Sequence, residues 1–332
     1  MTIQTGKIDS SSTRAVESNP SLRQLERAAG WYFPPVLRRV MPTAVRDALR
    51  ELRGWILARY LTRRLPRNKE FEQSLEDAQA SAFLSIIVPV HDAPEITRRC
   101  LMSLQKYASK AEIILVDDAS KLEETRRILE DFSRRNGWKL IRHLEPLGHS
   151  GACGAGARVA TRTYLCLLNS DTVVTPWCWR LITQTFEDNP NIGVAGPSTS
   201  YAGTQQTVHL ANFTRHYLND SQICEFAGRL FAECPGTNLT DLPWVSGFAF
   251  FIRRSVWEQL GGFDRNLPDY GNDVELCRRI LGIGHRVVWV RNSYIHHFAS
   301  ASYSKTIGMK SILARVRAAE KYFNHKYRSS NL

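Results

Sequence analysis

The run LSIIVPV at positions 84–90 decides the fold class, because it is short, apolar and rich in β-branched residues, as buried strands are. Three further runs with strand character follow it: EIILV (112–116), KLIR (139–142) and YLCLL (164–168). Stretches with helical periodicity accompany them at 96–107, 122–136 and 151–161. Strand–helix alternation at this spacing predicts an α/β fold with a parallel, doubly wound sheet.

Acidic side chains follow two of these predicted strands. Asp118 comes two residues after EIILV, and Asp171 comes three residues after YLCLL. Doubly wound sheets bind ligands beyond the carboxyl ends of their strands, so both carboxylates fall where a ligand is expected. Asp118 is either part of such a site or the N-cap of the helix that follows. Asp171, close to Asn169, is a candidate metal–diphosphate site, since hard divalent cations take oxygen ligands and bridge substrate phosphates.

Two later clusters contain further candidate site residues. Asp273 lies at the start of a predicted helix (273–281), where it is either an ordinary helix-opening residue or a general base. His296 and His297 follow a predicted strand (286–290), and one of them is a candidate metal contact. No cysteine joins them at zinc spacing, so a structural zinc site is not expected.

The net charge of +12, from 44 basic and 32 acidic residues, favours an anionic partner such as a nucleotide diphosphate, an acidic glycan or a membrane surface. A nucleic-acid partner is not expected, because no zinc-finger or RNA-binding aromatic motif is present. The seven cysteines are odd in number and show no CxxC spacing, which predicts free thiols and a cytoplasmic protein. No apolar run approaches the roughly 20 residues of a membrane span.

Three regions are expected along the chain. Residues 1–80 form a polar tail and a basic amphipathic helix at 43–65, followed by a polar linker at 70–81. That basic helix either packs on the main domain or lies on an anionic membrane, which would place the protein on the inner face of that membrane. Residues 81–303 form the main domain, with 199–241 rich in loops. Residues 304–332 form a C-terminal basic helix, with its regular pattern at 313–327.

Seven sequence blocks, in order, resemble the family-2 glycosyltransferases, which are inverting enzymes with the GT-A fold. The blocks are SIIVPVHD (85–92), EIILVDDAS (112–120), GACGAGA (151–157), YLCLLNSDTVVTP (164–176), VSGFAFFIRRSVWEQLGGFD (245–264), YGNDVELCRR (270–279) and SYIHHFASASY (293–303). The details are most similar to bacterial members that build surface polysaccharides, including rhamnosyltransferase-like ones. The first 80 residues lie outside the resemblance.

The resemblance implies a role for each matching position. The base and ribose of the nucleotide would be lined by Pro89, His91 and Asp118, with Asn169 beside them in the donor site. A Mg²⁺ or Mn²⁺ ion would be held by Asp171 and His297, and the catalytic base would be Asp273.

The chain departs from the family pattern in four places. His91-Asp92 stands where Tyr-Asn is common, and Asn169 replaces the first acid of the DxD-type motif. Asn272 replaces a Glu, and Gly154 replaces an Asn. None of these changes removes a residue assigned to catalysis.

The function expected from the resemblance is an inverting, metal-dependent transfer of a sugar from a nucleotide-sugar donor to a hydroxyl of a glycan or lipid-linked glycan. Surface polysaccharide biosynthesis is the expected setting. The alternative is a non-catalytic binding or scaffold protein on a transferase-like fold.

Overall fold

The computed structural model describes residues 69–208, 218–233, 236–299 and 303–328, together with residues 211 and 216 and single positions between 45 and 65. Side chains of the last segment are described for residues 313–327. The predicted polar tail lies outside the described residues, as does most of the predicted basic helix at 43–65.

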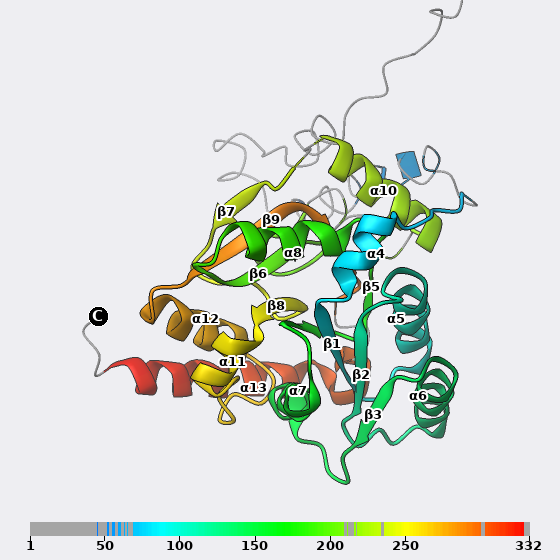
Figure 1. Ribbon diagram of the computed structural model, residues 1–332. Helices are drawn as coiled ribbons and strands as arrows, with labels where there is room; N and C mark the ends of the chain where they lie inside the picture. The colour runs from blue at the N-terminus through cyan, green and yellow to red at the C-terminus, as the bar shows by residue number, and fades with distance from the viewer. Residues whose placement is uncertain are drawn as a thin grey trace, which may run out of the picture.

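An eight-stranded mixed sheet forms the centre of the molecule, with strand order β3-β2-β1-β4-β8-β6-β9-β7 (Figure 1). The strands are β1 (Leu84–Val90), β2 (Glu112–Asp117), β3 (Lys139–Arg142), β4 (Tyr164–Leu168), β6 (Ile192–Ser198), β7 (Leu239–Asp241), β8 (Ala249–Arg253) and β9 (Arg286–Tyr294). β3, β2, β1 and β4 are parallel, and so are β6 and β9. β8 runs antiparallel to both of its neighbours, and β7 is an antiparallel edge strand. The predicted α/β fold with a mostly parallel, helix-flanked sheet is confirmed.

Helices cover both faces of this sheet. They are α4 (Leu75–Ser81), α5 (Pro94–Tyr107), α6 (Glu123–Asn136), α7 (Gly148–Val159), α8 (Cys178–Asp188), α10 (Asp220–Glu233), α11 (Arg254–Leu260), α12 (Asn272–Gly282) and α13 (Tyr303–Arg328). Alternate residues of a strand point to opposite faces. In β1, Ile86 and Val88 therefore pack with α5, α6 and α8, whereas Ile87 packs with α7, α11 and α12. This two-sided burial explains why the strands read as continuous apolar runs.

The glycine- and alanine-rich sequence of α7 reflects how closely this helix approaches the sheet. A Cβ added at Gly156 would lie 2.4 Å from Cγ2 of Ile87, so a side chain has no room there. At Gly154, two residues away, the nearest atom would be Nη1 of Arg158 at 3.9 Å. The N-terminus of α7 lies at the carboxyl end of β2, where the N–H of Gly148 donates to Asp118.

The expected linker at 70–81 is wrong for residues 75–81, which form α4. Asp77 is buried in this helix, and its Oδ1 accepts the backbone N–H groups of Trp179 (3.0 Å) and Arg180 (2.8 Å) in the first turn of α8. This polar segment therefore packs against the main domain, because the buried carboxylate of Asp77 caps the N-terminus of α8.

The region 199–241 is also more regular than expected, because it contains α10 and β7. Ile223, Phe226 and Ala227 are buried at helical spacing on one side of α10. The last helix begins at Tyr303, ten residues before the predicted pattern at 313.

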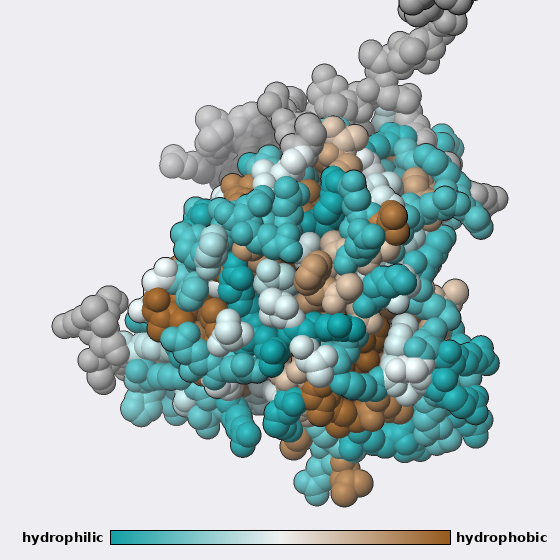
Figure 2. All heavy atoms as spheres, viewed as in Figure 1, coloured by the Kyte–Doolittle hydropathy of each residue, from teal (hydrophilic) through white to brown (hydrophobic). Residues whose placement is uncertain are grey.

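The coloured part of the face shown in Figure 2 is mostly hydrophilic, with small apolar groups near α7 and near α12. Six described cysteines, at 100, 153, 166, 178, 224 and 277, are buried free thiols. Within the described residues, no helix is both long enough and apolar enough to cross a membrane.

Candidate active site

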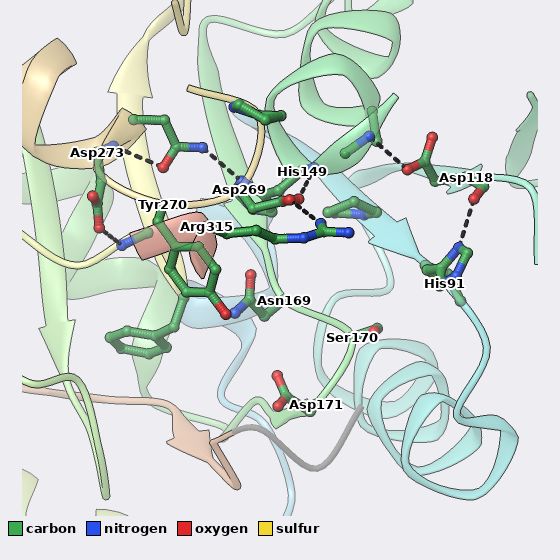
Figure 3. Close-up of a pocket in the computed structure, with 18 of the residues that line it drawn as sticks. His91, Asp118, His149, Asn169, Ser170, Asp171, Asp269, Tyr270, Asp273 and Arg315 are labelled. Carbon is green, nitrogen blue, oxygen red and sulfur yellow. Dashed lines mark hydrogen bonds and ion pairs between the residues drawn. The ribbon is translucent and has the colours of Figure 1, made fainter. Parts of the chain in front are cut away.

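A pocket of about 750 Å³ opens at the carboxyl ends of β1, β2 and β4. The structure places every predicted site residue in its lining: Pro89, His91, Asp118, Asn169, Asp171, Asp273 and His297. Figure 3 shows His91 and Asp118 on one side, Asp273 on the other, and Asn169 and Asp171 between and below them. Residues nearly 210 positions apart in the sequence therefore face one cavity.

The carboxylate of Asp118 is held by three donors on the side of the pocket formed by β1 and β2. Its Oδ1 accepts hydrogen bonds from His143 Nδ1 (2.7 Å) and from the N–H of Leu147 (2.8 Å). Its Oδ2 accepts from the N–H of Gly148 (2.9 Å), and its carbonyl oxygen accepts from His91 Nδ1 (2.7 Å). The carboxylate thus caps the N-terminus of α7, whose own N-cap residue, Leu147, has no side-chain acceptor.

The sequence-based alternative, in which Asp118 caps the next helix along the chain, is wrong. The N–H groups just before α6, those of Lys121 and Leu122, donate instead to Oδ1 of Asp92, each at 2.8 Å. The neighbouring Asp117 is buried and pairs with Arg142 (2.9 Å), so it is structural.

Asp171 and His297 lie together at the bottom of the pocket. The two-stranded pairing of β5 (Thr172–Val173) with β10 (His296–His297) brings the two residues side by side. His297 Nε2 lies 3.2 Å from Asp171 Oδ1. His296 points elsewhere: it is fully buried, its Nδ1 lies 2.8 Å from the Tyr294 hydroxyl, and it is not in the pocket lining. Of the two candidate histidines, His297 is the one that faces the site.

The geometry of His297 fits a divalent cation. Its Nδ1 lies 2.7 Å from the carbonyl oxygen of Tyr201, which can only accept, so Nδ1 carries the proton. Nε2 faces Asp171 and can bind a metal ion when it carries no proton, and the ring is fixed by stacking on Phe248 (5.1 Å between centroids). Metal-binding histidines are commonly oriented by such a bond from the other ring nitrogen. No third His, Cys, Asp or Glu joins this pair among the described residues, which suits an ion that takes its remaining ligands from substrate phosphates and water.

Asp273 occupies the first turn of α12. Its Oδ2 accepts the N–H of Gly247 (2.8 Å), and its Oδ1 accepts the N–H of Val274 (2.9 Å). Each carboxylate oxygen has a second lone pair, so the group can still accept a proton from a substrate hydroxyl. Burial raises the pKa of Asp273, and these backbone hydrogen bonds oppose the rise without cancelling it. A raised pKa is what a general base near neutral pH requires.

Asn272, beside Asp273, links two helices. Its Nδ2 donates to Ser150 Oγ (2.8 Å) and lies 3.1 Å from His149 Nδ1. Burial lowers the pKa of His149, so its ring is neutral at pH 7. The Asn at this position therefore fixes α12, and with it Asp273, against α7.

Residues 85–261 match the model of glycosyl transferase family 2. The chain belongs to this family. It is 30% identical over 233 residues to the O-antigen biosynthesis protein RfbC of Myxococcus xanthus, an alignment that covers 66% of this chain but only 17% of that protein. The chain thus spans a small part of the length of this relative.

Two solved structures share the fold at low sequence identity. The mannosyltransferase PcManGT from Pyrobaculum calidifontis, in complex with GDP-Man and Mn²⁺, has a TM-score of 0.53 and 15% identity, over 93% of this chain and 77% of that one. GalNAc-T7 with UDP, GalNAc and Mn²⁺ has a TM-score of 0.50 and 19% identity, over 64% of this chain and 42% of that one. These likenesses support the GT-A-like architecture.

The family motifs did not reveal two charged residues of this pocket, Asp269 and Arg315. Asp269 Oδ1 accepts the N–H of His149 (3.3 Å), and its Oδ2 pairs with the Arg315 guanidinium. Asp269 directly precedes the block YGNDVELCRR, but no sequence spacing connects it to Arg315, which lies on α13, beyond the family match. Only the tertiary structure brings the two together.

Proposed function

We propose that this chain is an inverting glycosyltransferase that moves a sugar from a nucleotide-diphosphate sugar to a hydroxyl of a glycan or lipid-linked glycan. The observation that carries the proposal is the convergence of Asp118, Asp171, Asp273 and His297 on one pocket. Membership of glycosyl transferase family 2 supports it.

The proposed reaction is a single displacement at the anomeric carbon. Asp118 and His91 line the nucleotide, and Asp273 accepts the proton of the acceptor hydroxyl as its oxygen attacks. The new bond joins the acceptor oxygen to the anomeric carbon, the bond from that carbon to the phosphate oxygen breaks, and the nucleoside diphosphate leaves. Attack from the face opposite the leaving group inverts the configuration. Asp171 and His297 would hold a Mg²⁺ or Mn²⁺ ion, which when bound neutralises charge on the diphosphate.

Surface polysaccharide biosynthesis is the setting we propose for this transfer. The support is the name of the 30%-identical relative, an O-antigen biosynthesis protein. Because the sequence resembles rhamnosyltransferase-like enzymes, a nucleotide-activated rhamnose is the donor that we would test first.

The proposal is tested by a thermal-shift screen of UDP-, dTDP- and GDP-sugars, including dTDP-rhamnose, with and without Mn²⁺. We expect one nucleotide class to raise the Tm, more strongly with Mn²⁺, and we expect the same donor to be consumed in a transfer or hydrolysis assay. Asp171→Ala should remove the part of the Tm increase that depends on Mn²⁺. Asp188→Ala, at the exposed end of α8, should leave this part of the Tm increase unchanged. A protein that binds and consumes none of these donors would contradict the proposal.

A further inference from the structure

The N-terminus of α7 points into the pocket, yet its N–H groups already have acceptors. Helix N-termini are common binding sites for phosphate, because their first N–H groups lack partners within the helix. Here the N–H groups of Leu147 and Gly148 donate to Asp118, and that of His149 donates to Asp269. The N–H of Ser150 donates to the carbonyl oxygen of Pro268 at 2.8 Å. A diphosphate in this pocket must therefore find its donors elsewhere.

The pocket is also poor in permanent positive charge. Its described lining contains four carboxylates, those of Asp118, Asp171, Asp269 and Asp273. The arginine and lysine side chains in the same lining are those of Arg315 and Lys121. A divalent ion at Asp171 would offset part of this negative charge, but a diphosphate adds at least two further negative charges. A fixed cation close to the diphosphate would consequently strengthen its binding.

Arg315 has the placement and the chemistry for this role. In Figure 3 its side chain extends across the pocket, with Asp273 on one side and His91 and Asp118 on the other. Its guanidinium pairs with Asp269, whose side chain is 5% exposed, while the Arg315 side chain is itself 43% exposed to the cavity and solvent. A guanidinium presents several N–H donors in a plane and can bind a carboxylate and a phosphate oxygen together.

The helix that carries Arg315 is firmly docked. Positions 315, 319, 322 and 326 share one face of α13 at helical spacing. Tyr322 and Lys326 both donate to Asp264 Oδ2, at 2.8 and 2.6 Å, and Lys326 also donates to the buried Glu275 at 2.7 Å. Nearer to Arg315 on this face, Ala319 faces Gly271, the residue before α12. The contacts with Asp264, Gly271 and Glu275 fix the direction in which Arg315 enters the pocket.

We propose that Arg315 binds the diphosphate of the donor, so that the C-terminal helix α13 completes the donor site of this transferase. The inference rests on the proposed function. Asp269 holds the guanidinium in place before the donor arrives, and the positively charged guanidinium then binds the diphosphate beside it.

The test is calorimetric binding of UDP, GDP and dTDP in the presence of Mn²⁺, with the parent nucleosides at high concentration as ligands without phosphate. For whichever diphosphate binds, Arg315→Ala should weaken binding roughly 10- to 100-fold, as expected for loss of a charge-assisted contact. Binding of the nucleoside should not change. Arg315→Lys should fall in between, because it keeps the charge without the planar donors. Arg317→Ala is the matched control, since Arg317 is exposed on another face of the same helix and is not in the pocket lining.

Unchanged diphosphate binding by Arg315→Ala would overturn the inference and leave the proposed function intact. An equal loss in Arg317→Ala would also overturn it, because the effect would then be one of net charge. A wild-type chain that binds none of the three diphosphates would overturn both. If Arg315→Ala failed to fold, Arg315→Gln would decide, because it removes the charge while keeping a long polar side chain. Wild-type affinity of Arg315→Gln for the diphosphate would overturn the inference, and a loss comparable to that expected for Arg315→Ala would support it.

Discussion

Replacing Asp273 by Asn tests the assignment of the catalytic base, and its two expected effects can be separated. An amide cannot accept the proton of the acceptor hydroxyl at neutral pH, so the contribution of the base is lost. A positioned general base typically contributes roughly 10²- to 10⁴-fold to the rate. This corresponds to about 2.7 to 5.5 kcal/mol in the activation free energy.

The same substitution has a cost in stability that follows from the hydrogen bonds of Asp273. Its two oxygens accept from two different backbone groups, the N–H of Gly247 and that of Val274. Asparagine has one oxygen, so one of these N–H groups must face an NH₂ group. Leaving a buried donor unpaired lowers the free energy of unfolding by about 1–3 kcal/mol. Domains are stable by about 5–15 kcal/mol, so the variant should stay folded with a Tm a few degrees lower.

The assay measures turnover at saturating donor, donor binding by calorimetry, and the Tm. We expect turnover to fall at least about 10²-fold while donor affinity stays within a few-fold of wild type. Asp241→Asn is the control for replacing a carboxylate by an amide, because Asp241 is exposed, pairs with Arg286 and lies away from the pocket. Turnover of Asp273→Asn within tenfold of wild type would refute the base assignment.

Three further results are expected. Gly156→Ala should lower the free energy of unfolding by about 1–3 kcal/mol, because the added Cβ would overlap Ile87. Gly154→Ala in the same helix is the control and should be neutral or stabilising. Chemical denaturation measures both free energies, and equal effects would contradict the packing argument. Burial raises the pKa of Asp273, so kcat/KM should fall on acidification at a higher pH than for an ordinary aspartate. The fall is expected because a protonated carboxyl group can no longer act as a base. A pH–rate profile without this acid limb would contradict the assignment of Asp273 as the base. Asp264→Asn should expose α13 to limited proteolysis, because the Asp264 carboxylate accepts hydrogen bonds from Tyr322 and Lys326 of α13. Burial raises the pKa of Asp264, but hydrogen bonds from Lys326, Asn266 and Tyr322 outweigh it and lower the pKa to about 2. Unchanged protection of α13 would show that its other contacts suffice.

The sheet and the positions of the two strand-end acids, Asp118 and Asp171, were predictable for a common reason. Buried strands such as β1 and β4 produce long apolar runs, and the residues that follow them must lie at the sheet edge where ligands bind. Asp118 and Asp171 were expected at this edge for that reason, whereas Asp273 and His297 were expected only from the order of the family blocks. All four line one pocket, and the roles assigned to them stay predictions.

The parts that were missed depend on contacts between distant segments. Nothing local shows that Asp77 caps α8 or that Asp118 caps α7, because the capped N–H groups lie far along the chain. In α10 the buried positions at 223, 226 and 227 were a usable helical signal, but the polar residues before them favoured a loop. The pairing of Asp269 with Arg315 has no sequence signal, since it requires α13 to be docked.

The docking of α13 matters for how this chain is divided in the laboratory. A fragment cut to the family-matched stretch, 85–261, would lack α12 as well as α13, and one that ended at residue 299 would still lack α13. The second fragment would keep Asp171, Asp273 and His297 but lose the wall that carries Arg315, and the carboxylates of Asp264 and Glu275 would lose cationic and hydroxyl partners. If Arg315 binds the diphosphate as proposed, a fragment with boundaries drawn from sequence similarity alone would retain the family motifs but bind its donor weakly. Expression trials and domain swaps should keep the chain intact through residue 328.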